Sequence, residues 1–134
     1  MNGSCLCGSV TYNVAEDLEL KLACHCHHCQ KQTGSAFSLL YGAPRGSVAI
    51  QGQIQTYQDR GDSGKPVHRM FCPRCGSCVA VEADVLPHIT FVFGGTLDNQ
   101  PLQHPDRQIF CRSAEPWVTV QATESFQTMP SAPN

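Results

Sequence analysis

The chain has 134 residues, and its eleven acidic and nine basic side chains give a formal net charge of −2. This length suits one domain that buries roughly two thirds of its unfolded surface. The charges are spread without runs, whereas nucleic-acid binding usually requires a basic stripe. No apolar run approaches membrane-spanning length, and residues 1–4 are too short and polar for a signal peptide. We therefore expect a cytoplasmic protein without nucleic-acid or membrane partners.

Alternation of apolar and polar residues predicts a chain that is mostly β. Strands are expected, in chain order, at residues 10–14, 18–23, 37–41, 48–50, 54–57, 67–71, 79–81, 89–93 and 117–120. Gly52 and Gln53 predict a hairpin turn between two of these strands, and the turn-forming residues 59–66 predict an exposed loop. Helical periodicity is weak, so only one or two turns of helix are expected, over residues 27–33 before Gly34.

The domain organisation is predicted to be simple, because no internal repeat and no boundary divides the sequence. Residues 1–122 are expected to form a single domain. Residues 123–134 are polar and contain two prolines, which predicts a loose C-terminal tail.

The cysteines are the most informative residues. Seven of the nine gather in three short clusters, namely Cys5 with Cys7, Cys24 with Cys26 and Cys29, and Cys72 with Cys75. In a reducing compartment, closely spaced cysteines indicate metal ligands and not disulfides, and an odd number cannot pair completely. A secreted disulfide protein is the less favoured alternative.

The two outer pairs together predict a closed structural zinc site. Structural zinc takes four ligands in a tetrahedron, and four thiolates are available from Cys5, Cys7, Cys72 and Cys75. Gly8 and Gly76 follow the two pairs, where a positive φ lets backbone amides turn toward the sulfurs.

The middle cluster predicts a second zinc site that lacks one ligand. Three thiolates from Cys24, Cys26 and Cys29 leave a net charge of about −1 on Zn²⁺, which makes the ion a weak activator of water. Such a site is better suited to hold a fourth thiol as its thiolate, since metal coordination deprotonates a thiol outright. We therefore assign these three cysteines to a catalytic metal site that adds a thiol to, or removes it from, an electrophile.

Other residues could alter this second site. Cys78 or Cys111 could complete its coordination, and the protein would then be a non-catalytic zinc-binding module with both sites structural. His25, His27 or His28 could instead replace a cysteine as ligand.

The remaining histidines and nearby cations are expected to be ordinary polar or solvated residues. They are His68, His88 and His104, together with Lys31, Arg69 and Arg74 near the cysteine clusters. A Rieske iron–sulfur centre is excluded, because the Cys72–Cys75 pair has no histidine to supply the second half of its motif.

The ordered clusters resemble the glutathione-dependent formaldehyde-activating enzyme family, which also includes centromere protein V. Four segments carry the resemblance: residues 3–10 (GSCLCGSV), 24–37 (CHCHHCQKQTGSAF), 71–77 (FCPRCGS) and 95–99 (GTLDN), the last followed by Pro116 and Trp117. Together they span nearly the whole chain.

This resemblance implies a β-tent fold, in which antiparallel sheets lean together around the metals. It also implies one structural zinc at the four outer cysteines and a second zinc at the middle three. The implied substrates are glutathione and formaldehyde, which give S-hydroxymethylglutathione, and the implied class is the carbon–sulfur lyases. Thr33 and Ser35 are candidates to hydrogen-bond the developing alkoxide, although hydroxyls in turns often bind backbone instead.

Overall fold

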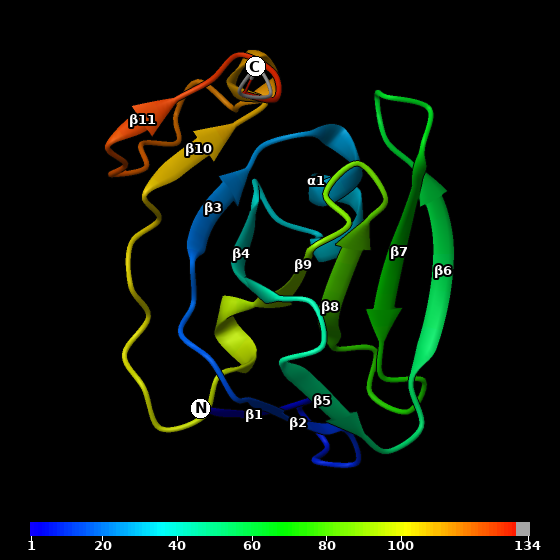
Figure 1. Ribbon diagram of the computed structural model, residues 1–134. Helices are drawn as coiled ribbons and strands as arrows, with labels where there is room; N and C mark the ends of the chain where they lie inside the picture. The colour runs from blue at the N-terminus through cyan, green and yellow to red at the C-terminus, as the bar shows by residue number, and fades with distance from the viewer. Residues whose placement is uncertain (131–134) are drawn as a thin grey trace.

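The structure is a computed structural model that describes residues 1–130, and its strands form two sheets (Figure 1). The smaller sheet has the order β1-β2-β5, with strands Asn2–Ser4, Thr11–Val14 and Val48–Gln51. The larger sheet has the order β11-β10-β3-β4-β9-β8-β7-β6. Its strands, taken along the chain from β3, are Leu20–Cys24, Ser38–Pro44, Gln55–Arg60, Pro66–Phe71, Cys78–Ala83, Ile89–Phe93, Arg107–Ile109 and Glu124–Ser125.

In the described part of the chain, one α-helix, α1 (His27–Thr33), interrupts the strands between β3 and β4, and two 3-10 turns cover Gly94–Thr96 and Cys111–Ser113. In Figure 1 the small sheet lies at the bottom of the view, while α1 and β10–β11 lie toward the top. Within residues 1–130 no helix is long and apolar enough to cross a membrane.

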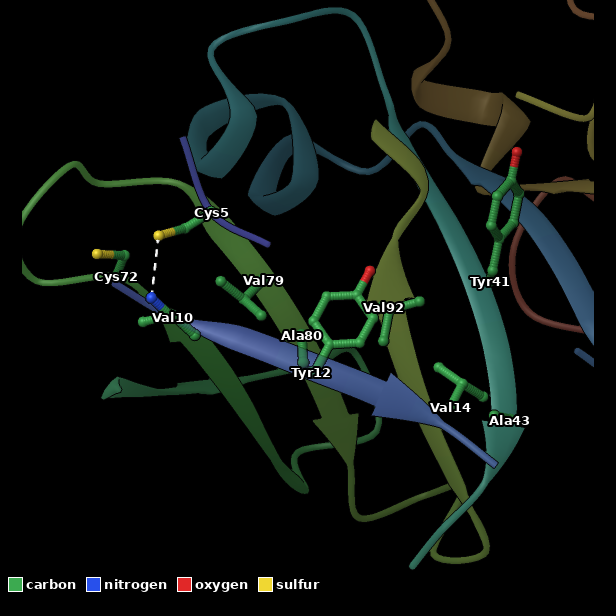
Figure 2. Packing of buried hydrophobic residues seen from close by; sticks show 10 residues of the cluster. All are labelled: Cys5, Val10, Tyr12, Val14, Tyr41, Ala43, Cys72, Val79, Ala80 and Val92. Carbon is green, nitrogen blue, oxygen red and sulfur yellow. Dashed lines mark hydrogen bonds between the residues drawn. The ribbon is translucent and has the colours of Figure 1, made fainter. Parts of the chain in front are cut away.

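Two buried clusters cover opposite faces of the central strands. Alternate residues of a strand point to opposite faces, and neighbours such as Leu40 and Tyr41, or Ala80 and Val81, belong to different clusters. One face packs against the small sheet, where Tyr12 lies among residues of β4, β8 and β9 (Figure 2). Cys5 and Cys72 belong to this cluster, whereas Cys24 and Cys29 belong to the other. The two groups of metal-ligand candidates are thus separated by the large sheet.

The prediction of a mostly β single domain is confirmed, and so is the helix over residues 27–33. Eight expected strands correspond to observed ones, but the strand at 117–120 is wrong, since this segment is irregular and Trp117 is 76% exposed. The sequence did not predict β1, β10 or β11. The sheets are antiparallel except at one edge, where β10 runs parallel to both β3 and β11.

The predicted loose tail is wrong for the residues that the structure describes. Glu124 and Ser125 form β11, which pairs with β10. Phe126 and Met129 pack against the second cluster, and the Phe126 amide donates to Gln108 O at 2.9 Å. These two apolar side chains attach an otherwise polar segment to the sheet. Residues 131–134 of the expected tail lie outside the described residues.

The hairpin predicted at Gly52 and Gln53 is also wrong, because β5 and β6 lie in different sheets. Gly52 has a φ of 100°, and a Cβ atom there would lie 2.2 Å from the carbonyl oxygen of Ser9. The glycine therefore lets the chain pass between the sheets against the loop that carries Cys5 and Cys7.

Replacing Gly52 with alanine is expected to destabilise the fold more than the same change at Gly46. Both glycines have positive φ, so both variants acquire about 1–2 kcal/mol of backbone strain. Only Gly52→Ala adds a backbone clash, worth about 1–3 kcal/mol more, because nothing lies within 4 Å of a Cβ at Gly46. Urea unfolding of both variants measures the difference, and equal free energies of unfolding would contradict the close contact.

Candidate metal centres

Four cysteines from two distant loops come together beside the small sheet. Cys5 and Cys7 lie between β1 and β2, and Cys72 and Cys75 lie between β7 and β8. Their four sulfurs all lie within 4.8 Å of one another, with Cys5–Cys7 at 3.7 Å and Cys7–Cys72 at 3.8 Å. Zinc–sulfur bonds of about 2.3 Å give a tetrahedron with edges of about 3.8 Å. The spacing therefore fits a single tetrahedral ion held by four thiolates.

Hydrogen-bond donors surround these sulfurs. The Val10 amide donates to Cys5 Sγ at 3.3 Å (Figure 2), and the Arg74 and Cys75 amides approach Cys72 Sγ at 3.4 and 3.5 Å. Hydrogen bonds from Ser77, whose hydroxyl lies 3.2 Å from the sulfur, lower the pKa of Cys75 to about 5. Such donors stabilise the negative sulfur that a metal ligand carries.

The glycines that follow the two pairs have the backbone conformation expected of them. Gly8 has a φ of 79° and Gly76 a φ of 77°, a region that favours glycine. The Gly76 amide donates to Cys72 O at 2.9 Å, which closes the turn around the second pair. The same short turn therefore carries both thiolates of that pair.

The other three clustered cysteines meet where β3 leads into α1. Cys24 ends β3, Cys26 is the N-cap of α1, and Cys29 lies in its first turn. The three sulfurs lie within 4.8 Å of one another, and the Cys29 amide donates to Cys26 Sγ at 3.3 Å. Cys24 and Cys29 are buried, whereas Cys26 is only half-buried. The cluster is thus closest to solvent on the Cys26 side.

These three thiols compete for negative charge. Hydrogen bonds from Cys24 and Cys29 lower the pKa of Cys26 to about 2. Hydrogen bonding to Cys26 and Cys29, together with burial, raises the pKa of Cys24 far above its usual range. Negative charge is therefore favoured at Cys26 and disfavoured at Cys24. A divalent ion is the group that would allow all three sulfurs to be thiolates together.

The two remaining cysteines do not complete this cluster. Cys78 Sγ donates to Gln32 O at 3.6 Å and Cys111 Sγ to Gln108 O at 3.7 Å, and neither sulfur joins a ligand group in residues 1–130. The alternative in which one of them caps the second site therefore gains no support.

The nearby histidines also lie outside both groups within the described chain. His25 is buried, with Nε2 2.9 Å from Gln108 Oε1 and no partner for Nδ1. His28 Nδ1 lies 2.6 Å from Asp59 Oδ2. His27 is exposed on the first turn of α1. The three-cysteine cluster thus has no fourth ligand from these residues.

Of the two hydroxyls considered for the alkoxide, that of Thr33 is hydrogen-bonded to backbone, and Ser35 is exposed. Thr33 Oγ1 donates to Cys29 O at 2.8 Å and accepts from the Ser35 amide at 3.2 Å, so this hydroxyl binds the end of the helix. Ser38, which the sequence did not single out, is buried, and its hydroxyl has no nitrogen or oxygen partner. Ser38 is the register partner of Cys24 between β3 and β4. Ser38 therefore lies beside the cluster.

Arg69 is the main correction to the sequence analysis, since it is buried and not a solvated surface residue. Lys31 and Arg74 are exposed as expected, but Arg69 is only 8% exposed. Its Nε donates to Asp59 Oδ2 at 2.9 Å and its Nη1 to Gln32 Oε1 at 2.5 Å. Alternation along β7 could have revealed this, because residue 69 shares a strand face with Val67, which packs against the second cluster.

Fold and site together define a mostly β protein with two cysteine groups that could hold metal ions, one closed by four sulfurs and one with three. The chain belongs to the glutathione-dependent formaldehyde-activating enzyme family, which matches residues 1–113 and so includes both groups. A crystal structure of a protein from Rhodobacter sphaeroides has a similar fold, with a TM-score of 0.59 and 19% sequence identity over 75% of this chain and 91% of that chain. No curated protein matches the sequence.

Proposed function

We propose that the protein is a zinc-dependent enzyme of the carbon–sulfur lyase type. It joins a small thiol, such as glutathione, to a small aldehyde, such as formaldehyde, or separates them again. The observation that carries this proposal is the three-sulfur group, which lies within the family-matched part of the chain and has no fourth protein ligand among residues 1–130. In the proposal, Cys5, Cys7, Cys72 and Cys75 hold a structural zinc, and Cys24, Cys26 and Cys29 hold the catalytic one.

The second zinc, when bound, supplies an open position that favours the thiolate form of a substrate thiol. The chain's own residues supply the rest. Cys24 and Cys29 are fixed by the second core cluster, and Cys26 is fixed by its N-cap contact with the Cys29 amide. A site held by a strand end and a helix start changes little in geometry during a reaction, which favours positioning of two small substrates.

In the addition direction, the substrate thiol loses its proton and its sulfur forms a bond to the aldehyde carbon. The π electron pair of the carbonyl moves to oxygen, which takes a proton, so the product is a hemithioacetal, which carries an S-hydroxymethyl group when the aldehyde is formaldehyde. The reverse reaction breaks the same carbon–sulfur bond and returns thiol and aldehyde. No oxidant or reductant is needed, which agrees with a site built from zinc-type ligands.

The proposal predicts that the zinc-loaded protein accelerates exchange between glutathione, formaldehyde and their adduct. Exchange spectroscopy by NMR at equilibrium measures this rate directly against the spontaneous reaction. We expect an enhancement proportional to protein concentration, and its loss when the second zinc is removed. A rate equal to that of a zinc-free buffer control would exclude this thiol and aldehyde as the substrates.

A further inference from the structure

Arg69 is the one buried cationic side chain among residues 1–130, and it is hydrogen-bonded to the helix that carries Cys29 of the three-cysteine group. A charge removed from water is costly unless neighbours compensate it. Two of its nitrogen atoms donate hydrogen bonds, Nε to the Asp59 carboxylate and Nη1 to the Gln32 side-chain oxygen. Gln32 lies in α1, one turn after Cys29, so the helix that carries two of the cysteines also holds the guanidinium.

Asp59, which lies in β6, holds Arg69 in place, and its carboxylate accepts hydrogen bonds from several donors. It accepts from His28 at 2.6 Å and from the Arg60 amide at 2.8 Å, in addition to Arg69. Burial raises the pKa of Asp59, but these hydrogen bonds outweigh burial and lower it overall. The carboxylate therefore remains ionised and only part of its charge is directed at Arg69.

The guanidinium also interacts with the cysteine sulfurs. Burial lowers the pKa of Arg69, whereas Asp59 and Cys29 raise it and give a net upward shift. Arg69 thus lies between the Asp59 carboxylate on β6 and the sulfurs at the start of α1.

We infer that Arg69 is a positioning residue whose charge allows an anionic fourth ligand to bind at the three-cysteine centre. This inference rests on the proposed function. Three thiolates around a divalent ion have a net charge of about −1, and an incoming thiolate makes it about −2 as its proton leaves. The fixed guanidinium of Arg69 offsets the negative charge that the incoming thiolate adds. A neutral aldehyde adds no charge, so its binding gains nothing from the guanidinium. Arg69 therefore favours the thiol partner in particular.

The expected effect follows from the influence of a nearby opposite charge. Such a charge within about 4–6 Å shifts an ionisation by about 1–3 pKa units. At fixed pH, loss of the Arg69 charge should therefore weaken binding of an anionic ligand by roughly 10- to 1,000-fold.

The test uses full-length protein loaded with Co²⁺, whose visible absorption reports each new ligand. Glutathione and, separately, thiocyanate as an inorganic anion are titrated into wild type, Arg69→Gln, Arg69→Lys and Arg45→Met. The Arg69→Gln variant keeps a hydrogen-bonding side chain without the positive charge, whereas Arg69→Lys keeps the positive charge. Arg45 is the matched control, because it forms a comparable ion pair with Glu82 at 2.9 Å on the surface. Cobalt content and circular dichroism establish that each variant is folded and carries two ions.

The inference is supported if Arg69→Gln binds both anions at least tenfold more weakly, while Arg69→Lys and Arg45→Met stay within about threefold of wild type. Equal affinities of wild type and Arg69→Gln overturn the inference and leave the proposed function standing. The inference is also overturned if Arg69→Lys binds the anions as weakly as Arg69→Gln, because the shape of the side chain and not its charge would then determine the affinity. If wild type binds thiocyanate but not glutathione, and Arg69→Gln weakens thiocyanate binding, the inference holds and glutathione is excluded as the thiol of the proposed function. If the wild-type protein binds neither anion, both the inference and the proposed function with glutathione are rejected.

Discussion

Replacing Cys72 with serine is expected to unfold most of the protein at room temperature. Cys72 is fully buried, accepts two amide hydrogen bonds and approaches Cys7 from 65 residues away. Binding of a structural zinc contributes roughly 10–16 kcal/mol to folding. That is comparable to the total stability of about 5–15 kcal/mol typical of a domain. Loss of this ion therefore removes most or all of the margin that keeps the chain folded.

Far-UV circular dichroism, dispersion of amide NMR signals and zinc content measure this outcome. The matched control is Cys111→Ser, the same chemical change at a cysteine outside both groups. We expect this control to retain a native spectrum and two zinc ions. A Cys72→Ser protein with native dispersion and full zinc content would show that the four-sulfur group does not stabilise the fold.

The local part of the fold could be predicted from the sequence because its signals are local. The helix over 27–33 begins after Cys26, whose sulfur caps the Cys29 amide, and ends at Gly34 with a φ of 66°. Both boundaries are marked by residues within one helical turn. Likewise, the glycines after each outer cysteine pair indicated turns that the structure contains.

The unpredicted parts depend on partners far away in the sequence. β10 and β11 have three and two residues, too few for alternation to be visible, and they exist because β3 offers an edge. β5 pairs within the small sheet and β6 within the large one, and no local feature of Gly52 indicates that the two strands separate. The partner of Arg69 could not be predicted for a similar reason, since Gln32 lies 37 residues earlier and in a helix.

The cysteine groups combine both kinds of information. The spacing within each pair or triplet is local, so the sequence alone indicated which cysteines act together and that the groups contain four and three sulfurs. The joining of Cys5 and Cys7 to a loop 65 residues later is not local, and it was predicted from the needs of a tetrahedral ion and from the family resemblance. The surroundings of the triplet, including Ser38, Asp59 and Arg69, became visible only with the packing of β6 and β7 beside α1.

Replacing Cys26 with serine is expected to abolish the proposed activity while leaving the fold intact. Cys26 is the half-buried member of its group, and its structural role is to cap α1. Serine is among the best N-cap residues, so the helix start should survive the change. Serine is nevertheless a far poorer zinc ligand than a thiolate. The substitution therefore separates metal binding from folding in a way that a buried cysteine such as Cys24 does not allow.

We expect Cys26→Ser to contain one zinc ion per chain and to exchange glutathione with formaldehyde at least about 100-fold more slowly than wild type, since even indirect damage to a metal site costs 10- to 100-fold. Its thermal unfolding should remain cooperative, unlike that of Cys72→Ser. Zinc analysis and NMR exchange rates on the same samples, with Cys111→Ser as control, measure both effects. Wild-type exchange by a one-zinc Cys26→Ser protein would mean that the chemistry occurs elsewhere, because the sulfur nearest to solvent would then be dispensable. One zinc, an intact fold and background exchange would instead link the activity to the three-sulfur group.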